Sequence, residues 1–169
     1  GMFENVCLAI KVALDLNIDK KIIQKTLPSL KFEGRYQYLN HGKIKNKLHK
    51  NETIMIDGAH SPADSLNLYN YLKTIKLPIY GIWAMSKNKE PDLFVKNLKG
   101  IFKKVVTMPI ENENSVNPDL LNKIASRNNI ASEVADNFKT ALTKISSKEK
   151  KLIVCFGSLY NCGNILNQN

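Results

Sequence analysis

The sequence has few cysteines, only two arginines and no long hydrophobic run. Its apolar stretches fall well short of the roughly 20 residues that span a bilayer, so we expect no membrane-spanning helix. No basic segment precedes an apolar stretch near the start, which predicts no secretory signal. Three scattered cysteines cannot form a disulfide framework, and the three histidines lack metal-ligand spacing. We therefore expect no metal site and a reducing, cytoplasmic location.

Two common nucleotide-binding motifs are also missing. The sequence contains neither a Gly-x-x-x-x-Gly-Lys-[Ser/Thr] phosphate loop nor a Gly-x-Gly-x-x-Gly dinucleotide fingerprint. If the protein handles a nucleotide, it lacks the usual loop that cradles the triphosphate.

The formal net charge of +10 suggests a nucleic-acid partner, but the kind of charge argues against one. Arg35 and Arg127 are the only arginines, although arginine is the residue best suited to base and phosphate contacts. The lysines are spread over the whole chain, and such a field gives only salt-sensitive, non-specific attraction. We predict no specific nucleic-acid partner. Binding to duplex DNA that survives about 200 mM salt would reverse this interpretation.

The remaining composition, 169 residues of which 43% are hydrophobic, allows a core of ordinary size. Apolar residues recur at helical spacing in residues 1–30, with a turn at Asn17–Asp19. Arg35–Leu39 is expected to form a strand, and Lys43–Leu48 to return beside it as a hairpin. We place a helical segment at residues 1–30 and a second domain at residues 31–169.

From residue 53 onward, short apolar strands alternate with amphipathic helices. Strands are expected at 53–56, 79–83, 104–108 and 151–155, and helices at 62–73, 91–99, 118–126, 137–145 and 161–166. Three of these helices are expected to bury Leu66, Tyr69, Leu72, Leu93, Phe94, Leu98, Leu120, Leu121 and Ile124. The alternation predicts an α/β fold: a mostly parallel sheet with helices on both faces, preceded by a short helical segment. Ligands of such folds bind at the carboxyl ends of the strands.

The segment Ile56–Pro62 leads a predicted strand into a helix. Gly58 permits a tight turn, and Ser61 suits the cap of the following helix. Asp57 and His60 are then placed together at the sheet edge, where they could hold hydroxyls or phosphate oxygens. The same residues fit a simple capping turn, and the pattern alone leaves both interpretations open.

Two further segments are candidates for ligand contacts. Cys155–Tyr160 again leads a strand into a helix, and Ser158 could either bind a carboxylate or cap that helix. Ser158 is not a hydrolase nucleophile, because it has no obvious base partner and lacks the Gly-x-Ser-x-Gly pattern. Glu33–Arg35 lies where the helical segment gives way to the sheet. Arg35 is a candidate phosphate ligand or a surface arginine in a linker.

Taken in order, Phe32–Arg35, Asp57–Pro62 and Phe156–Tyr160 resemble three motifs of the C-terminal domain of folylpolyglutamate synthase/dihydrofolate synthase, in the Mur ligase superfamily. Residues 5–13 resemble the last helix of the preceding ATPase domain, and residues 106–115 resemble a linker after the third strand. The resemblance covers essentially the whole chain. It implies a Rossmann-like C-terminal domain at 31–169, preceded at 1–30 by a remnant of the ATPase domain.

The resemblance also implies an activity. In that family, ATP phosphorylates a pteroate or folate carboxylate, and the amine of L-glutamate attacks the acyl phosphate, giving an amide, ADP and phosphate. The ATPase domain brings the phosphate loop and Mg²⁺. Carried over by motif, the resemblance implies that Asn5 lies near the adenine, that Arg35 contacts an ATP phosphate and that Asp57 contacts the nucleotide ribose. It also implies that His60 is the catalytic residue that lines the acyl-phosphate and glutamate region, and that Ser158 contacts the incoming glutamate.

The chain departs from the family pattern in three ways. Ser61 stands where the motif Asp-Gly-Ala-His-Asn-Pro has asparagine. Residues 84–90 lack the Lys-Asp pair that the family usually carries there, and the phosphate-loop domain is missing. We therefore expect the chain alone not to catalyse the ATP-dependent step, and to need the ATPase domain in cis or in trans. Two alternatives are a stand-alone, non-catalytic nucleotide- or anion-binding module, and a sister Mur ligase domain acting on cell-wall precursors. The Gly-Ser-Leu-Tyr ending favours the folate branch.

Overall fold

The computed structural model describes residues 2–111 and 114–169. The chain divides into two compact units, residues 1–33 and residues 34–169. The candidate site described below lies in the second unit.

The first unit is helical. It contains α1 (Met2–Asp15), α2 (Lys20–Thr26) and the single turn η1 (Leu27–Ser29). The Asp19 carboxylate accepts a hydrogen bond from the Lys21 N–H at 2.7 Å and thereby caps the start of α2. The expected pair of helices is present, and α2 buries none of its side chains.

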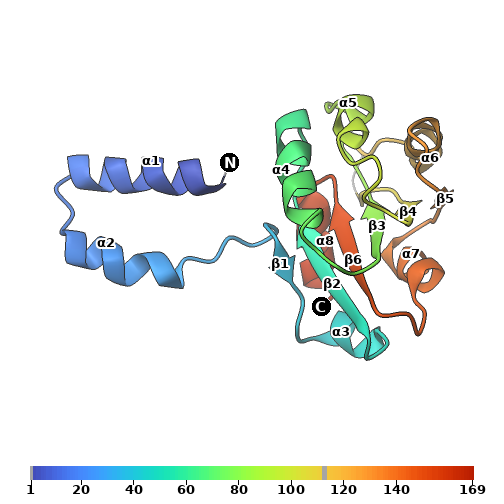
Figure 1. The fold of residues 1–169 in the computed structure, drawn as a ribbon, viewed down its shortest axis with the longest axis horizontal. Coiled ribbons are helices and arrows are strands. Elements are labelled where there is room, and N and C mark those ends of the chain that lie inside the picture. Colours follow the sequence, from blue (N-terminus) through green and yellow to red (C-terminus); the bar gives the residue numbers. More distant parts are fainter. Residues whose placement is uncertain (1, 112–113) are drawn as a thin grey trace. The chain divides into compact units, whose positions relative to one another are not determined.

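The second unit is built on one six-stranded sheet (Figure 1). Its strands are β1 (Gln37–Tyr38), β2 (Glu52–Asp57), β3 (Ile79–Trp83), β4 (Lys104–Thr107), β5 (Ser132–Val134) and β6 (Lys151–Phe156). Their order across the sheet is β1-β2-β6-β3-β4-β5. Only β1 runs antiparallel to its neighbour, and the other pairs are parallel. The predicted mostly parallel sheet is confirmed.

Helices cover both faces of this sheet, as predicted. They are α3 (Lys43–Lys47), α4 (Pro62–Leu72), α5 (Pro91–Lys96), α6 (Pro118–Arg127), α7 (Phe138–Ile145) and α8 (Leu159–Asn167). The crossover helices α4, α5 and α6 share one core cluster, whereas α7 and α8 belong to the cluster on the other face (Figure 1). Right-handed crossovers change face when the chain reverses direction across the sheet. Here it reverses after β5 and returns to insert β6 beside β2, so the switch point falls at the carboxyl ends of these strands.

Alternation along the central strands supplies both halves of the core. Met55, Val154 and Phe156 pack with α4, α5 and α6, whereas Ile56 and Cys155 pack with α7 and α8. Every residue of β6 is buried, as expected for a parallel strand covered on both faces.

The predicted hairpin at residues 43–48 is wrong, because residues 43–47 form α3. The predicted strand at 35–39 is reduced to β1, which pairs with β2 instead. Asn169 caps α3: its backbone carbonyl accepts the Lys43 N–H at 2.8 Å, and its Oδ1 accepts the Ile44 N–H at 3.1 Å. Ile44 is buried. The spacing of Ile44 and Leu48 fits one face of a helical turn as well as it fits a strand.

The helix faces were also partly mispredicted. Leu66, Leu93 and Leu120 were expected inside but are 50%, 50% and 46% exposed. Each helix turns about 100° per residue, so an apolar neighbour of a core residue can lie outside the buried stripe. The other predicted core positions on these helices are buried, except the half-buried Tyr69.

Sequence patterns missed β5 entirely. Its three residues are all only partly buried, and its pairing with β4 rests on backbone hydrogen bonds rather than on an apolar pattern. The linker predicted at 106–115 includes residues 112 and 113, which lie outside the described residues.

Candidate functional site

The three sequence motifs of the second unit meet at the carboxyl ends of β2 and β6. Asp57 and Phe156, the last residues of these strands, lie opposite each other in the sheet. The loop after β2 is tied to the segment before β1 by a hydrogen bond from the Gly58 N–H to the Gly34 carbonyl at 2.6 Å. Leu159, at the start of α8, packs against both glycines. Three segments far apart in sequence therefore form one edge.

The close packing of Leu159 explains why positions 34 and 58 of the motifs are glycine. A Cβ on Gly58 would lie 2.8 Å from Leu159 Cδ1, and one on Gly34 would lie 2.9 Å from the same atom. These distances leave no room for a methyl group unless Leu159 moves.

Gly157 has a separate requirement. Its φ of +101° is a conformation that side-chain-bearing residues rarely adopt, and a Cβ there would lie 2.4 Å from the Ala84 carbonyl oxygen. Glycine at this position lets the β6 loop pass directly over the end of β3.

Asp57 links two of the converging segments. It is 2% exposed, and its two carboxylate oxygens accept the Tyr36 N–H at 2.9 Å and the Ala59 N–H at 2.8 Å. Burial raises the pKa of Asp57, although both N–H bonds and the charge of Arg35 oppose this. The residue predicted to contact a ribose thus also holds the Arg35 segment against the β2 loop.

Arg35 is the cation of this edge. It is half-buried, and its charge acts to lower the pKa of both Asp57 and Asp64, whereas burial acts to raise it. The net effect is that the pKa of Asp57 is raised and that of Asp64 is lowered. Among the described residues, its guanidinium makes no hydrogen bond or ion pair. Its five donors are therefore available to an anion.

His60 lies at the same edge with its side chain 31% exposed. Its Nδ1 is 2.7 Å from the Gly58 carbonyl oxygen and 3.8 Å from the Asp64 carboxylate. The Asp57 and His60 pair predicted from one motif is thus placed at one end of the sheet, with Arg35 within electrostatic reach.

Ser61 caps α4, as predicted. Its hydroxyl accepts the Asp64 N–H at 3.1 Å, and the Asp64 carboxylate accepts the Ser61 N–H at 3.2 Å, which completes a capping box. Serine therefore performs the capping task at the position where the family motif has asparagine. Asp64 was not identified from the sequence, although Ser-x-x-Asp before a helix is a recognisable signal.

Ser158 caps α8. Its hydroxyl accepts the Asn161 N–H at 3.3 Å, and the residue is 3% exposed. Its contact with a ligand stays a prediction. Asn5 lies on α1, in the first unit, and its adenine contact stays a prediction.

A tyrosine cluster beside the site was not anticipated. Tyr36 has a φ of +45°, and its ring lies 4.8 Å from that of Tyr71, whose hydroxyl is 2.9 Å from the Tyr38 hydroxyl. Burial and this hydrogen bond raise the pKa of Tyr38 to about 12. The left-handed backbone of Tyr36 points its N–H at Asp57, and no sequence pattern signals such a conformation.

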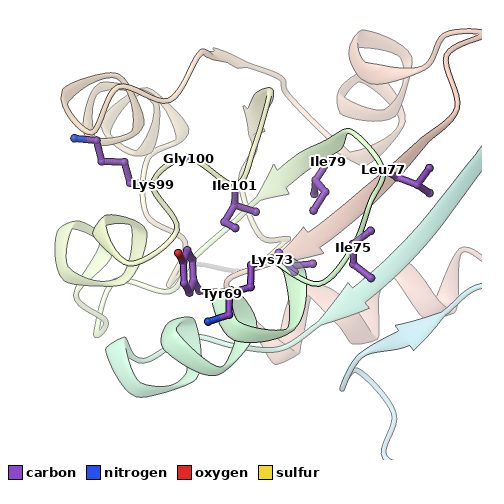
Figure 2. Close-up of a pocket in the computed structure, with 9 residues that line it drawn as sticks. Tyr69, Lys73, Ile75, Leu77, Ile79, Lys99, Gly100 and Ile101 are labelled. Atoms are coloured by element: carbon purple, nitrogen blue, oxygen red, sulfur yellow. The ribbon is translucent and has the colours of Figure 1, made fainter.

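A separate pocket of about 420 Å³ lies at the opposite end of the sheet (Figure 2). It is lined by Tyr69, Leu72, Lys73, Ile75, Leu77, Ile79, Lys99, Gly100 and Ile101. Ile79 begins β3, and Ile101 precedes β4, so these residues mark the amino ends of parallel strands. Ligands of such sheets bind at the other end, and the motif residues are not in this pocket.

Within residues 2–111 and 114–169, no group of three or more His, Cys, Asp or Glu side chains could hold a metal ion. In the same ranges, no helix has both the length and the apolar character needed to cross a membrane.

The fold and the edge together define a parallel α/β domain with a cation and a histidine at its topological switch point. Residues 37–168 match the family model described as dihydrofolate synthetase, C-terminal domain. The chain belongs to this family. The match includes Asp57, His60 and Ser158 but begins after Arg35. Among curated proteins, none matches the sequence.

Solved structures share the fold. Folylpolyglutamate synthase of Mycobacterium tuberculosis, complexed with ADP, matches with a TM-score of 0.76 and 18% identity over 88% of this chain and 35% of that one. The E. coli FolC complex with DHPP and ADP gives a TM-score of 0.71 and 15% identity over 88% of this chain and 34% of that one. Folylpolyglutamate synthase of Thermotoga maritima gives a TM-score of 0.71 and 23% identity over 97% of this chain and 37% of that one. This chain spans about a third of their length.

Proposed function

We propose that this chain is the C-terminal part of an ATP-dependent ligase that joins L-glutamate to dihydropteroate or a folate through an acyl phosphate. The observation that carries the proposal is the convergence of three motif segments on one edge, where the guanidinium of Arg35 makes no hydrogen bond or ion pair among the described residues. Membership of the dihydrofolate synthetase C-terminal family supports it. ATP and Mg²⁺ would be held mainly by the ATPase domain, which brings the phosphate loop.

Arg35 is proposed to contact the ATP phosphates. A guanidinium offers planar, forked donors that suit phosphate oxygens, and this one has no partner among the described residues. Its segment is held in place by the Tyr36 N–H on Asp57 and by the Gly34 carbonyl on the Gly58 N–H. The cation is thus presented from a fixed loop, as positioning of a reacting phosphate requires.

The remaining roles follow from the family resemblance. His60 is proposed as the catalytic residue of the acyl-phosphate and glutamate region, Ser158 as a glutamate contact and Asp57 as a ribose contact. Attack of an amine on an acyl phosphate needs positioning and exclusion of water more than a protein nucleophile. A domain that supplies binding groups at one edge is suited to that task.

The helical unit is proposed to be a remnant of the ATPase domain, with Asn5 near the adenine. Its α2 buries no side chain, and α1 exposes Phe3, Leu8 and Val12. Helices this short are marginal in water without packing against an apolar surface. We therefore propose that the ATPase domain, in cis or in trans, is the partner of this unit.

The first experiment measures ADP release by the 169-residue chain with ATP, Mg²⁺, L-glutamate, and dihydropteroate or tetrahydrofolate. We expect no release from the chain alone, and release that depends on both glutamate and the pteroate or folate once the ATPase part is supplied. A complete enzyme that transfers no glutamate would refute the proposal. Tight ATP binding by the chain alone, without turnover, would favour the non-catalytic module, and glutamate-free activity on cell-wall precursors would favour the sister ligase.

The second experiment compares Arg35→Gln with Arg127→Gln in the complete enzyme. Arg127 is exposed at the end of α6 and is the only other arginine. Loss of a charge-assisted hydrogen bond of about 1.5–3 kcal/mol predicts a rise of about 10- to 150-fold in the KM for ATP in Arg35→Gln. Equal effects of the two substitutions would remove Arg35 from the nucleotide site.

A further inference from the structure

We propose that the Gly58 carbonyl and the Asp64 carboxylate hold neutral His60 as the Nδ1–H tautomer, so that its Nε2 is offered to the ligand as a hydrogen-bond acceptor. Asp64 is then a positioning residue that acts through His60. The catalytic meaning of this arrangement rests on the proposed function, whereas the arrangement itself does not.

The Gly58 carbonyl fixes the location of the proton. Its oxygen lies 2.7 Å from His60 Nδ1, and a carbonyl oxygen can only accept a hydrogen bond. The contact is favourable only when Nδ1 carries the hydrogen. In the neutral ring Nε2 then has a free lone pair, and no described residue bonds to it. In free neutral histidine the proton prefers Nε2, so the protein reverses the ordinary preference.

Asp64 fixes the ring and its backbone. Its Oδ2 accepts the backbone N–H of His60 at 3.3 Å and that of Ser61 at 3.2 Å, and lies 3.8 Å from His60 Nδ1. The last distance is too long for a hydrogen bond, but it places a negative charge beside the Nδ1–H dipole. Burial raises the pKa of Asp64, but the hydrogen bonds from residues 60 and 61 and the charge of Arg35 outweigh it, so that the pKa is lowered overall.

The tautomer narrows what His60 can bind. A neutral ring with a free Nε2 can accept a hydrogen bond from an amine, but it cannot donate one to the oxygens of an acyl phosphate. Under the proposed function, His60 therefore contacts the amino group of L-glutamate, and Arg35 is left to contact the phosphate. The ligand class assigned to His60 is a primary amine or ammonium.

The test is nitrogen-15 NMR of the imidazole rings in the 169-residue chain, at about pH 8.5, two units above the ordinary histidine pKa of about 6.5. His60→Gln assigns the signals among the three histidines. We expect a pyrrole-like Nδ1 and a pyridine-like Nε2 for His60. A ring that is predominantly Nε2–H in the unsubstituted chain would overturn the proposal.

Variants test the part played by Asp64. In Asp64→Ala, we expect the ratio of Nδ1–H to Nε2–H to fall about fivefold, in keeping with the loss of one modest interaction. Asp64→Asn keeps an acceptor oxygen for the two backbone amides, so the ratio of Nδ1–H to Nε2–H should fall less in this variant. The matched control is Asp119→Ala, which removes another first-turn carboxylate, on α6. A ratio in Asp64→Ala equal to that in Asp119→Ala would show that Asp64 does not position the ring.

These outcomes are separable from failure of the proposed function. The spectra need no ATP, folate or ATPase domain, so an Nε2–H ring refutes the tautomer even if the complete enzyme makes amides. An Nδ1–H ring in a protein that forms no amide would refute the ligase assignment alone.

Discussion

Lys151 and Glu52 form the most deeply buried ion pair among the described residues, and Lys151→Met tests its contribution to stability. The two side chains are 1% and 0% exposed, with Nζ 3.3 Å from the carboxylate. Removing one partner of a buried pair costs about 3–5 kcal/mol, because the other charge stays buried. Glu52 keeps hydrogen bonds from the N–H groups of His49 and Ser147 and from the Ser146 hydroxyl, at 2.8–2.9 Å. We therefore expect a loss near the lower limit, about 3 kcal/mol.

Urea denaturation, followed by the fluorescence of Trp83, measures this loss. Trp83 is the only tryptophan and is fully buried in β3, so its emission reports on the sheet domain. With a slope of about 2 kcal/mol per molar urea, the midpoint should fall by about 1.5 M. The matched control is Lys150→Met at the exposed neighbouring position, which should shift the midpoint little.

The result that refutes the reasoning is a free energy of unfolding for Lys151→Met within about 0.5 kcal/mol of Lys150→Met. A second comparison uses Glu52→Gln combined with Lys151→Met. Since the double variant leaves no unpaired buried charge, it should cost less than the sum of the single variants.

Three other predictions use the same protein. Burial acts to raise the pKa of Glu52, but its hydrogen bonds outweigh burial and lower the pKa below the ordinary value of 4.5, so the ionised carboxylate stabilises the fold fully at pH values above 4.5. An acid titration followed by Trp83 fluorescence should show this stabilisation being lost as the pH falls through the lower pKa of the folded state, and a flat profile in that range would contradict the prediction. Gly157→Ala should lower the free energy of unfolding in urea by about 2 kcal/mol or more, because position 157 has a positive φ and the new Cβ would clash with the Ala84 carbonyl oxygen. Gly163→Ala, inside α8, should raise it by about 0.5–1 kcal/mol, because a Cβ there meets no atom within 4 Å. Equal shifts in the two variants would refute the steric argument. Thiol titration of the folded chain should modify Cys7 quickly and the other two cysteines only on unfolding, since they are buried and burial raises their pKa; rapid reaction of all three would contradict the packing.

The main elements of the fold could be predicted from the sequence because their signals are local. Apolar runs in β2, β3, β4 and β6 and the amphipathic spacing between them are properties of neighbouring residues, and they suffice for a parallel α/β sheet. Ser61 likewise acts within one helical turn, so the helix cap that it forms could be predicted.

Other features depended on residues distant in sequence. Residues 43–47 form α3 rather than a strand because Asn169 supplies acceptors for the amides of its first turn. The exposure of Leu66 beside buried core positions was set by how α4 packs on the sheet. Short polar β5 exists because β4 offers it a free edge.

The candidate site divides in the same way. The sequence determined which chemical groups are available: a guanidinium at 35, a carboxylate at 57 and an imidazole at 60, each beside a residue that permits a turn. Only the tertiary structure decided that the Gly34 and Gly58 backbones bond to each other, that Asp57 binds the Tyr36 N–H, and that the His60 ring meets a carbonyl and a carboxylate. The physical reason is that side-chain identity is local, whereas hydrogen-bond geometry and burial arise where strands distant in sequence end side by side.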